Sequence, residues 1–298
     1  MSSESNLAVD TDENHTENIT RNDFLTEWEA IEDPKTQPLH CREVNEIEFD
    51  ELEKKVLAQD PTFVKAFVKS LYAGDAYIVN KAFSKEFMLD LKEKVHQYWS
   101  QQPSTFHKML EGCPDYHRII DEENTKKYAI KMGKHSCYFY PWNDDPLNLF
   151  PTVWKRWRIF KFLGGFPIDA YEKNTPKDGI VDRIQVVRYP PKIGYLEKHS
   201  DPYQSQRVIL SGFMSKRGVD YQGGGFYLID KNKNKFFPED IIDTGDIGIC
   251  YATVNHGVDP VDIHKSPDWS AKDGRWFLSM YSNMSDEVEN RETLQAVK

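Results

Sequence analysis

Three residues in two separate segments carry side chains that could bind a metal ion. His199 and Asp201 lie two residues apart in the segment YLEKHSDPY (195–203), and His256 follows an apolar run that begins at Ile249. Residues two apart on an extended segment point to the same face. Two imidazoles and one carboxylate form a facial ligand set that leaves three positions of an octahedral iron(II) open, as in oxygen-activating sites. A closed zinc site would need four protein ligands, and no fourth Cys or His lies near either segment.

Each half of this set also has a simpler explanation. About one His-x-Asp triplet is expected by chance in an acidic chain of this length with nine histidines. If residues 249–256 form one strand, alternation places His256 on the same face as Cys250 and Val254. His256 could then be a core histidine that is satisfied by a backbone carbonyl. The two interpretations differ on whether His256 meets the other two ligands.

Arg275 begins the next predicted strand after a polar loop, so it could lie beside the metal in the same sheet. An unpaired guanidinium inside a β core is very costly. No acidic residue in the adjoining strands is an obvious partner, so we expect the partner to be a ligand, and the planar fork suits a bidentate carboxylate. The alternative is an arginine that reaches solvent or pairs with Asp246.

The elements that must position these residues are mainly β. After Gly179 the chain shows short β runs with turn signals and no helical pattern between them, which predicts an antiparallel sandwich or jelly roll. Upstream, apolar spacing predicts helices between residues 24 and 71, after the cap Ser84 and around 147–163, and strands at 76–80 and 136–140. The predicted runs of the β region are 184–189, 207–214, 225–229, 247–254 and 276–281.

Composition narrows the classes of function. The chain has 298 residues, 39% of them hydrophobic, which suits a globular protein with a sizeable core. It has neither a membrane-spanning run nor the start of a secretory signal, so we expect a soluble cytoplasmic protein whose four scattered cysteines are reduced thiols. The net charge of −10 opposes binding to nucleic acid, and 231–235 looks like a solvated turn. The polar residues 1–22 are expected to form a disordered tail.

A series of motifs in order resembles the iron(II)- and 2-oxoglutarate-dependent oxygenases, whose core is a double-stranded β-helix of the jelly-roll, cupin-like type. The resemblance covers roughly residues 180–284 and implies a catalytic core at 176–285, a support region of helices at 23–175 and a C-terminal tail at 286–298, with 23–285 as one structural domain. The matching pieces are Ile184–Tyr189, His199-Ser-Asp201, Gly223–Phe226, Thr244-Gly-Asp246, His256-Gly-Val258 with Pro260-Val261, and Gly274-Arg275-Trp276.

The resemblance implies roles for residues. His199, Asp201 and His256 would bind iron(II), and Arg275 would hold the distal carboxylate of 2-oxoglutarate. Three further candidates for contacts with this cosubstrate are Tyr189, Gln185 and Ser279. Ser279 would replace the serine that many relatives carry where this chain has Phe277.

For Tyr189 the alternative is cross-strand packing, and for Gln185 it is a solvent-facing amide. The glycines at 223–225 are expected to serve a tight turn or bulge. His264, in the inserted polar loop, is expected at the surface.

The resemblance implies that O2 and 2-oxoglutarate are consumed while a C–H bond of the substrate is broken, with release of succinate and CO2. Asp201 favours hydroxylation, desaturation or ring closure over halogenation. Arg188, Arg207 and the segment 138–142 could line a pocket for a small, anionic metabolite, although packing and surface charge explain them too.

The sequence further resembles the algal kainoid synthases, which cyclise an N-prenylated glutamate, but no particular residue decides this. A prolyl-hydroxylase-like enzyme acting on proteins and a non-catalytic jelly-roll binding module are the alternatives. Nothing in the sequence indicates an oligomeric state.

Overall fold

The computed structural model describes residues 21–297. Residues 1–20 of the predicted disordered tail lie outside this range. Asn22, at the end of that predicted tail, already belongs to the fold, because its side chain accepts hydrogen bonds from the amides of Phe24 and Leu25 and caps the first helix.

The predicted helices are present, and Ser84 caps the helix that follows it, as expected. The Asp60 side chain accepts from the amide of Phe63, and Ser84 accepts from the amide of Phe87. No helix in the described part of the chain is both long and apolar enough to cross a membrane. The helices are α1 (Asp23–Ile31), α2 (Phe49–Ala58), α3 (Pro61–Tyr72), α4 (Lys85–Ser100), α5 (Glu122–Thr125) and α6 (Phe150–Leu163).

The strands form two sheets that face each other. The centre of the larger sheet has the order β10-β7-β12-β5, with every neighbouring pair antiparallel. Strands β2 and β1 extend it beyond β10, and β4 and β3 extend it beyond β5. Its strands are β1 (Val44–Glu48), β2 (Ala76–Asn80), β3 (Tyr116–Ile120), β4 (Met132–Phe139), β5 (Ile180–Tyr189), β7 (Val208–Phe213), β10 (Ile247–Tyr251) and β12 (Arg275–Met284).

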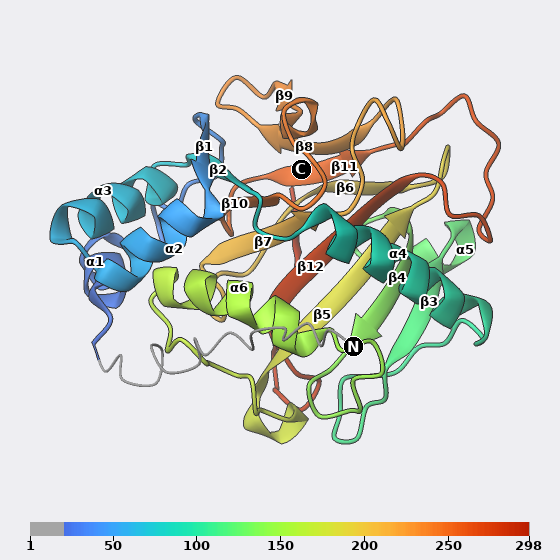
Figure 1. The fold of residues 1–298 in the computed structure, drawn as a ribbon, viewed down its shortest axis with the longest axis horizontal. Helices are drawn as coiled ribbons and strands as arrows, with labels where there is room; N and C mark the ends of the chain where they lie inside the picture. Colours follow the sequence, from blue (N-terminus) through green and yellow to red (C-terminus); the bar gives the residue numbers. More distant parts are fainter. Residues whose placement is uncertain (1–20, 298) are drawn as a thin grey trace, which may run out of the picture.

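The smaller sheet has the order β6-β11-β8-β9, and β13 pairs with β6 at its edge. From β5 to β12 the chain passes repeatedly between the two sheets, which is the winding of a double-stranded β-helix. The predicted jelly-roll core with helical support is therefore confirmed (Figure 1). The strands of the smaller sheet are β6 (Tyr195–Ser200), β8 (Gly225–Ile229), β9 (Lys235–Phe236), β11 (His256–Asp259) and β13 (Gln295–Ala296).

Alternation along the central strands separates a helix-covered face from an inner face. Helices α4 and α6 lie across β12 and β5 in Figure 1, and Trp99 of α4 stacks on Trp276 of β12 with ring centroids 5.2 Å apart. On β5, Ile184 and Val186 pack in the same core, whereas Val187 belongs to a different cluster. The odd-numbered residues of β5 therefore face the space between the two sheets.

One predicted strand is wrong in a way that matters for the site. The run 247–254, thought to continue to His256, ends at Tyr251 because the amide of Val254 turns back to the carbonyl of Tyr251. His256 instead begins β11 in the smaller sheet. His256 is thus carried by a separate strand, and not by the apolar stripe that contains Cys250.

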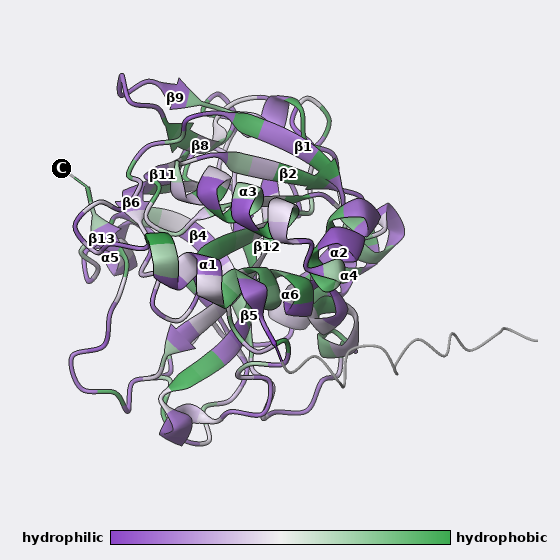
Figure 2. Ribbon diagram, turned by 90° about the vertical axis from the view of Figure 1, so that its left-hand side faces the viewer, coloured by the Kyte–Doolittle hydropathy of each residue, from purple (hydrophilic) through white to green (hydrophobic). Residues whose placement is uncertain are grey.

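Two turns agree with their predicted roles. The Lys231–Lys235 segment connects β8 to β9, and the Asp230 carboxylate accepts from the amides of Asn232 and Asn234 there. In Figure 2, β8 is green and the turn to β9 is purple, as a buried strand and a solvated turn require. Gly225 has φ +104°, and a Cβ there would lie 2.2 Å from Oε2 of Glu239, so a close contact requires the glycine.

The four cysteines are buried free thiols in the structure. Burial raises the pKa of Cys113 to about 11 and that of Cys41 to about 12. Burial also raises the pKa values of Cys137 and Cys250 well above the usual range of a thiol. The thiols therefore stay protonated at neutral pH and act as small core side chains.

Candidate functional site

The structure brings the three predicted metal ligands together. His199 lies near the end of β6, Asp201 follows that strand, and His256 starts β11, where it pairs in register with His199. One ligand atom from each side chain lies within 4.8 Å of the other two, and all three residues are buried. The alternative in which His256 is an isolated core histidine is therefore wrong.

Backbone carbonyls orient both imidazoles. Nδ1 of His199 lies 2.8 Å from the carbonyl oxygen of Glu197, and Nδ1 of His256 lies 2.9 Å from that of Val254. A carbonyl can only accept, so each Nδ1 carries a proton, and Nε2 is the nitrogen left to bind a metal. The Nε2 atoms lie 4.0 Å and 3.4 Å from carboxylate oxygens of Asp201. This second layer of bonds fixes the tautomer that a metal ligand needs.

The charges of the triad depend on one another. Burial, followed by the neighbouring His256, lowers the pKa of His199 to about 4, so this ring is neutral at pH 7. Burial alone would raise the pKa of Asp201, but the hydrogen bond and charge of His256 outweigh burial and lower it. For His256, the Asp201 carboxylate outweighs burial and raises the pKa. The Asp201 carboxylate is therefore ionised and stabilises a positive charge at this site.

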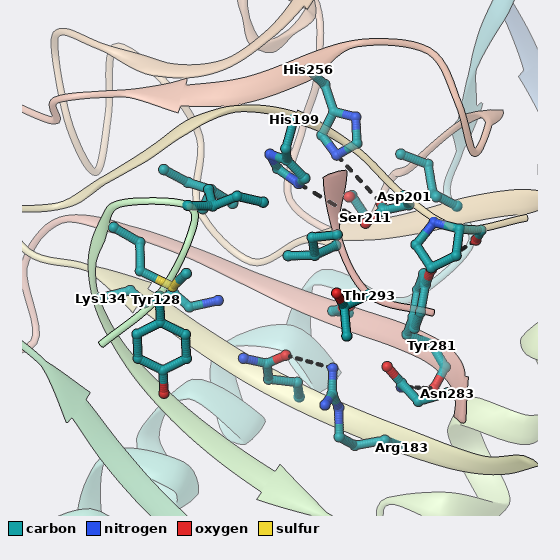
Figure 3. Close-up of a pocket in the computed structure, with 18 of the residues that line it drawn as sticks. Tyr128, Lys134, Arg183, His199, Asp201, Ser211, His256, Tyr281, Asn283 and Thr293 are labelled. Atoms are coloured by element: carbon teal, nitrogen blue, oxygen red, sulfur yellow. Dashed lines mark hydrogen bonds and ion pairs between the residues drawn. The ribbon is translucent and has the colours of Figure 1, made fainter. Parts of the chain in front are cut away.

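The triad opens into a cavity of about 430 Å³ between the sheets. Figure 3 shows His199, Asp201 and His256 on one wall and Arg183 on the opposite wall, while Lys134 and Tyr128 lie to one side and Tyr281 and Asn283 to the other. The volume falls within the range of small-molecule sites, roughly 300–1,000 Å³. The site can therefore accommodate a metal ion together with organic ligands.

Arg275 lines this cavity but has a protein partner that the sequence did not suggest. Its Nε donates to Oε1 of Glu239 at 2.6 Å, and both side chains are buried. Glu239 comes from the short 3-10 helix Pro238–Asp240 and is not part of an adjoining strand. The inference that Arg275 lacks an acidic partner is therefore wrong. Its alternative partner Asp246 instead accepts from the amides of Lys81 and Asp243.

Glu239 occupies only part of the Arg275 fork. Nη1 of Arg275 is buried and has no hydrogen-bond partner among the described residues, and the same holds for the hydroxyl of Tyr189. Tyr189 lies directly opposite Arg275 in the β5–β12 register, and both residues line the cavity. A buried, unpaired donor is costly, so an acceptor at this position would stabilise both groups.

The remaining predicted contact residues lie further along the same inner face. Gln185 on β5 is opposite Ser279 on β12, which in turn is opposite Ser211 on β7, and all three line the cavity. Gln185 is buried, so the alternative of a solvent-facing amide is wrong. Together these residues form a polar row across the centre of the larger sheet.

No protein-family model and no curated protein matches this sequence. Among solved structures, JOX2 in complex with 2OG, Fe and JA is 13% identical over 90% of this chain and 80% of that chain, with a TM-score of 0.49. A Pseudomonas putida prolyl-4-hydroxylase is 10% identical over 78% and 98%, with a TM-score of 0.43. A putative 2OG-Fe(II) oxygenase family protein from Caulobacter crescentus is 10% identical over 81% and 87%, with a TM-score of 0.45.

The jelly-roll core and the triad, both observed directly in this structure, match what the sequence motifs predicted. The chain has the double-stranded β-helix fold and the three converging ligands that the resemblance to the iron(II)- and 2-oxoglutarate-dependent oxygenases implied.

Two arginines proposed for the pocket lie elsewhere. Arg188 is on the helix-covered face of β5, where it bonds to three backbone carbonyls and to Asp273. Arg207 pairs with Glu32. Of the segment 138–142, only Tyr138 lines the cavity. His264 is exposed, as predicted.

Two of the cations that line the cavity, Arg183 on β5 and Lys134 on β4, were not among the residues predicted from the sequence. The position of Arg183 could have been predicted, because it lies two residues before Gln185 on the same strand and so faces the same side of the sheet. Reasoning from the sequence also missed the C-terminal segment. Residues 291–294 line the cavity, and β13 pairs with β6 beside His199 and Ser200.

Proposed function

We propose that the protein is an iron(II)- and 2-oxoglutarate-dependent oxygenase that oxidises a C–H bond of a small-molecule substrate. The observation that carries this proposal is the convergence of His199, Asp201 and His256 at one wall of the cavity. The overall reaction would convert 2-oxoglutarate and O2 to succinate and CO2, and the second oxygen atom of O2 would enter the substrate as a hydroxyl group or, in desaturation and ring closure, leave as water. Hydroxylation, desaturation and ring closure are the outcomes consistent with a carboxylate ligand at Asp201.

The donor set fits iron(II). Two imidazoles and one carboxylate would hold one face of the ion and leave neighbouring positions for a bidentate ligand and O2. A structural zinc site would need a fourth ligand, and the described residues offer only these three as a metal-binding group. A bound iron would supply the redox chemistry, while the protein side chains hold and orient the reactants.

The opposite end of the cavity fits the distal carboxylate of 2-oxoglutarate. Arg275 Nη1 and the Tyr189 hydroxyl are buried donors without a partner in the described chain, and both line the cavity. Glu239 fixes the Nε edge of the guanidinium, which directs the other edge toward the ligand. Phe277 stacks on Tyr189 with ring centroids 5.9 Å apart and shields this end from water. Ser279 and Gln185 lie between the two ends and could contact the cosubstrate.

A small-molecule substrate suits the size of the cavity better than a protein segment does. The C-terminal residues 291–294 form part of its wall, so an extended peptide would have to displace them. Ring closure of an N-prenylated amino acid, as in the kainoid synthases, is the narrowest version of this proposal. Its support is the sequence resemblance alone.

Anaerobic titration tests the proposal. Iron(II) and 2-oxoglutarate together should produce a weak visible charge-transfer band with the wild-type protein. The same additions should produce no band with a His256→Ala variant. A non-catalytic jelly-roll module would give no band in the wild-type protein. Succinate release that depends on both iron(II) and 2-oxoglutarate, measured across a set of small acids and amino-acid derivatives, would then identify the substrate.

A further inference from the structure

We propose that Arg183 and Lys134 bind the anionic group of the substrate, and that the substrate is an organic acid with an apolar body. The inference rests on the oxygenase function proposed above and adds the substrate class. It concerns two cations in the cavity that have no role in binding iron.

Arg183 is a cation without a counter-ion. Its Nε is buried and unpaired, and its one hydrogen bond is from Nη2 to Oε1 of Gln185 at 3.4 Å. The guanidinium lies 5.4 Å from the ring centroid of Tyr138, and no carboxylate in the described chain lies within ion-pair distance. An arginine held this way keeps most of its donors available to a ligand, and its planar fork suits a carboxylate.

Lys134 reaches the same cavity from the neighbouring strand β4 and is partly buried. Its ammonium makes no hydrogen bond or ion pair with any described residue. Burial, and then the charge of Arg183, lower the pKa of Lys134 to about 8, against the opposing effect of Asp201. The two cations therefore raise each other's electrostatic energy, and an anion between them would relieve this repulsion.

The protein does not supply that anion. Among the described residues that line the cavity, the acidic side chains are Asp201 and Glu292. Asp201 belongs to the metal triad, and Glu292 is exposed on the C-terminal segment. Figure 3 shows the ends of Lys134 and Arg183 directed into the space across from the triad. A ligand anion placed there would present its neighbouring carbon atoms to the metal.

The register of the larger sheet separates Arg183 from the position assigned to 2-oxoglutarate. Arg275 pairs with Tyr189, whereas Tyr281 pairs with Arg183, which lies six residues earlier in β5. At a rise of about 3.3 Å per residue the two levels are roughly 20 Å apart along the strand. The Tyr281 hydroxyl donates to the carbonyl of Pro202, so the Tyr281 side chain reaches from this level to the segment that carries Asp201.

Part of the cavity wall is apolar. Ile120, Ile130, Met132 and Leu196 form a buried cluster that lines the cavity, and Leu294 of the C-terminal segment packs against it. Burying apolar surface there would contribute about 25 cal/mol per Å². The cavity therefore combines a cationic pair with an apolar wall, which fits an acid that has a hydrocarbon body.

Octanoate and octanamide provide a matched pair of probes that differ in charge. Calorimetric titration of the anaerobic protein with iron(II) and 2-oxoglutarate already bound should give at least about tenfold tighter binding of octanoate, as expected for charge-assisted hydrogen bonds. The double variant Arg183→Gln/Lys134→Gln should reduce this preference to less than about twofold. Lys126→Gln, which removes an exposed cation paired with Glu123, should leave it unchanged.

Three results would overturn the inference. The two probes could bind the wild-type protein equally, the preference for octanoate could survive the double variant, or the double variant could weaken 2-oxoglutarate binding by more than about tenfold. The last result would assign the cations to the cosubstrate. The charge-transfer band in the wild-type protein reports the oxygenase function separately, so a missing probe preference with an intact band contradicts only the substrate class.

Discussion

The two faces of the larger sheet treat buried charge differently. On the helix-covered face, Lys161 of α6 pairs with Asp182 of β5, and Arg188 bonds to Asp273 and three carbonyls. On the cavity face, Arg183 and Lys134 have no acidic partner within residues 21–297, and Glu239 leaves Nη1 of Arg275 unpaired there. Charges that support the fold are matched within the protein, while charges that face the cavity are matched only in part.

This difference separates structural charges from functional ones. A buried charge without a partner is costly. Arg188, on the same strand, has carbonyl and carboxylate partners within the protein, so a similar set of partners for Arg183 would be structurally possible. The cationic cavity face is therefore best explained by ligands that carry negative charge, which are 2-oxoglutarate at one end and the substrate at the other. Four predictions test this comparison.

The largest effect is expected from breaking a matched pair on the helix-covered face. Lys161→Met leaves the Asp182 carboxylate buried without its cation, which should lower the free energy of unfolding by about 3–5 kcal/mol. Lys134→Met on the cavity face should have little effect or increase stability, because it removes repulsion with Arg183. Urea denaturation measures both. Equal destabilisation by the two variants would remove the distinction between the faces.

The next largest effect concerns the metal ligand. Asp201→Ala should weaken iron(II) binding by about 100-fold or more, because even residues that support metal ligands contribute 10–100-fold. Asp169→Ala removes an exposed carboxylate outside the cavity and is the matched control. Equilibrium dialysis against iron(II) under anaerobic conditions gives the constants. Unchanged iron affinity in the Asp201 variant would place the metal elsewhere.

A smaller effect is expected at Arg275. Arg275→Lys keeps a cation beside Glu239 but removes the fork, so one charged hydrogen bond to 2-oxoglutarate should be lost. We expect about tenfold weaker binding of 2-oxoglutarate with iron affinity retained. The control is Arg217→Lys, because Arg217 pairs with Asp240, the residue after Glu239 in the short helix Pro238–Asp240. If both variants bind 2-oxoglutarate as the wild-type protein does, Arg275 has only its structural bond to Glu239.

The smallest effect is a pH dependence. Lys134, which faces Arg183 and Asp201, has a pKa of about 8 and so is charged below that pH and neutral above it. The preference for octanoate over octanamide should be complete near pH 7 and decline several-fold by pH 9. Lys134→Arg should remove this decline because a guanidinium stays charged. An identical decline in both proteins would assign the titration to another group.

Much of the site could be predicted because its residues are separated by spacings that the sequence displays. His199 and Asp201 share a face at a spacing of two, and the order of the motifs indicated that His256 would join them. The jelly roll followed from the series of short β runs. The error at Tyr251, where the strand ends, did not matter for the triad, because pairing with β6 and not strand continuity brings His256 to the site.

The parts that escaped prediction depend on contacts between distant segments. Glu239 reaches Arg275 from a short helix 36 residues earlier in the chain, and nothing in its local sequence indicates this. Arg188 and Arg183 are similar residues on one strand, and only the face of the sheet distinguishes the satisfied cation from the free one. The spacing of two between Arg183 and Gln185 could have placed Arg183 on the cavity face. Placing Lys134 there depends on knowing that β4 pairs with β5.

An anaerobic crystal structure with iron(II) and 2-oxoglutarate tests the central claim most directly. The account predicts one metal ion bound by Nε2 of His199, Nε2 of His256 and a carboxylate oxygen of Asp201, with the distal carboxylate of 2-oxoglutarate bonded to Arg275 and Tyr189. Arg183 and Lys134 would remain free for substrate. A metal ion outside the triad, or 2-oxoglutarate held by Arg183 in place of Arg275, would contradict it.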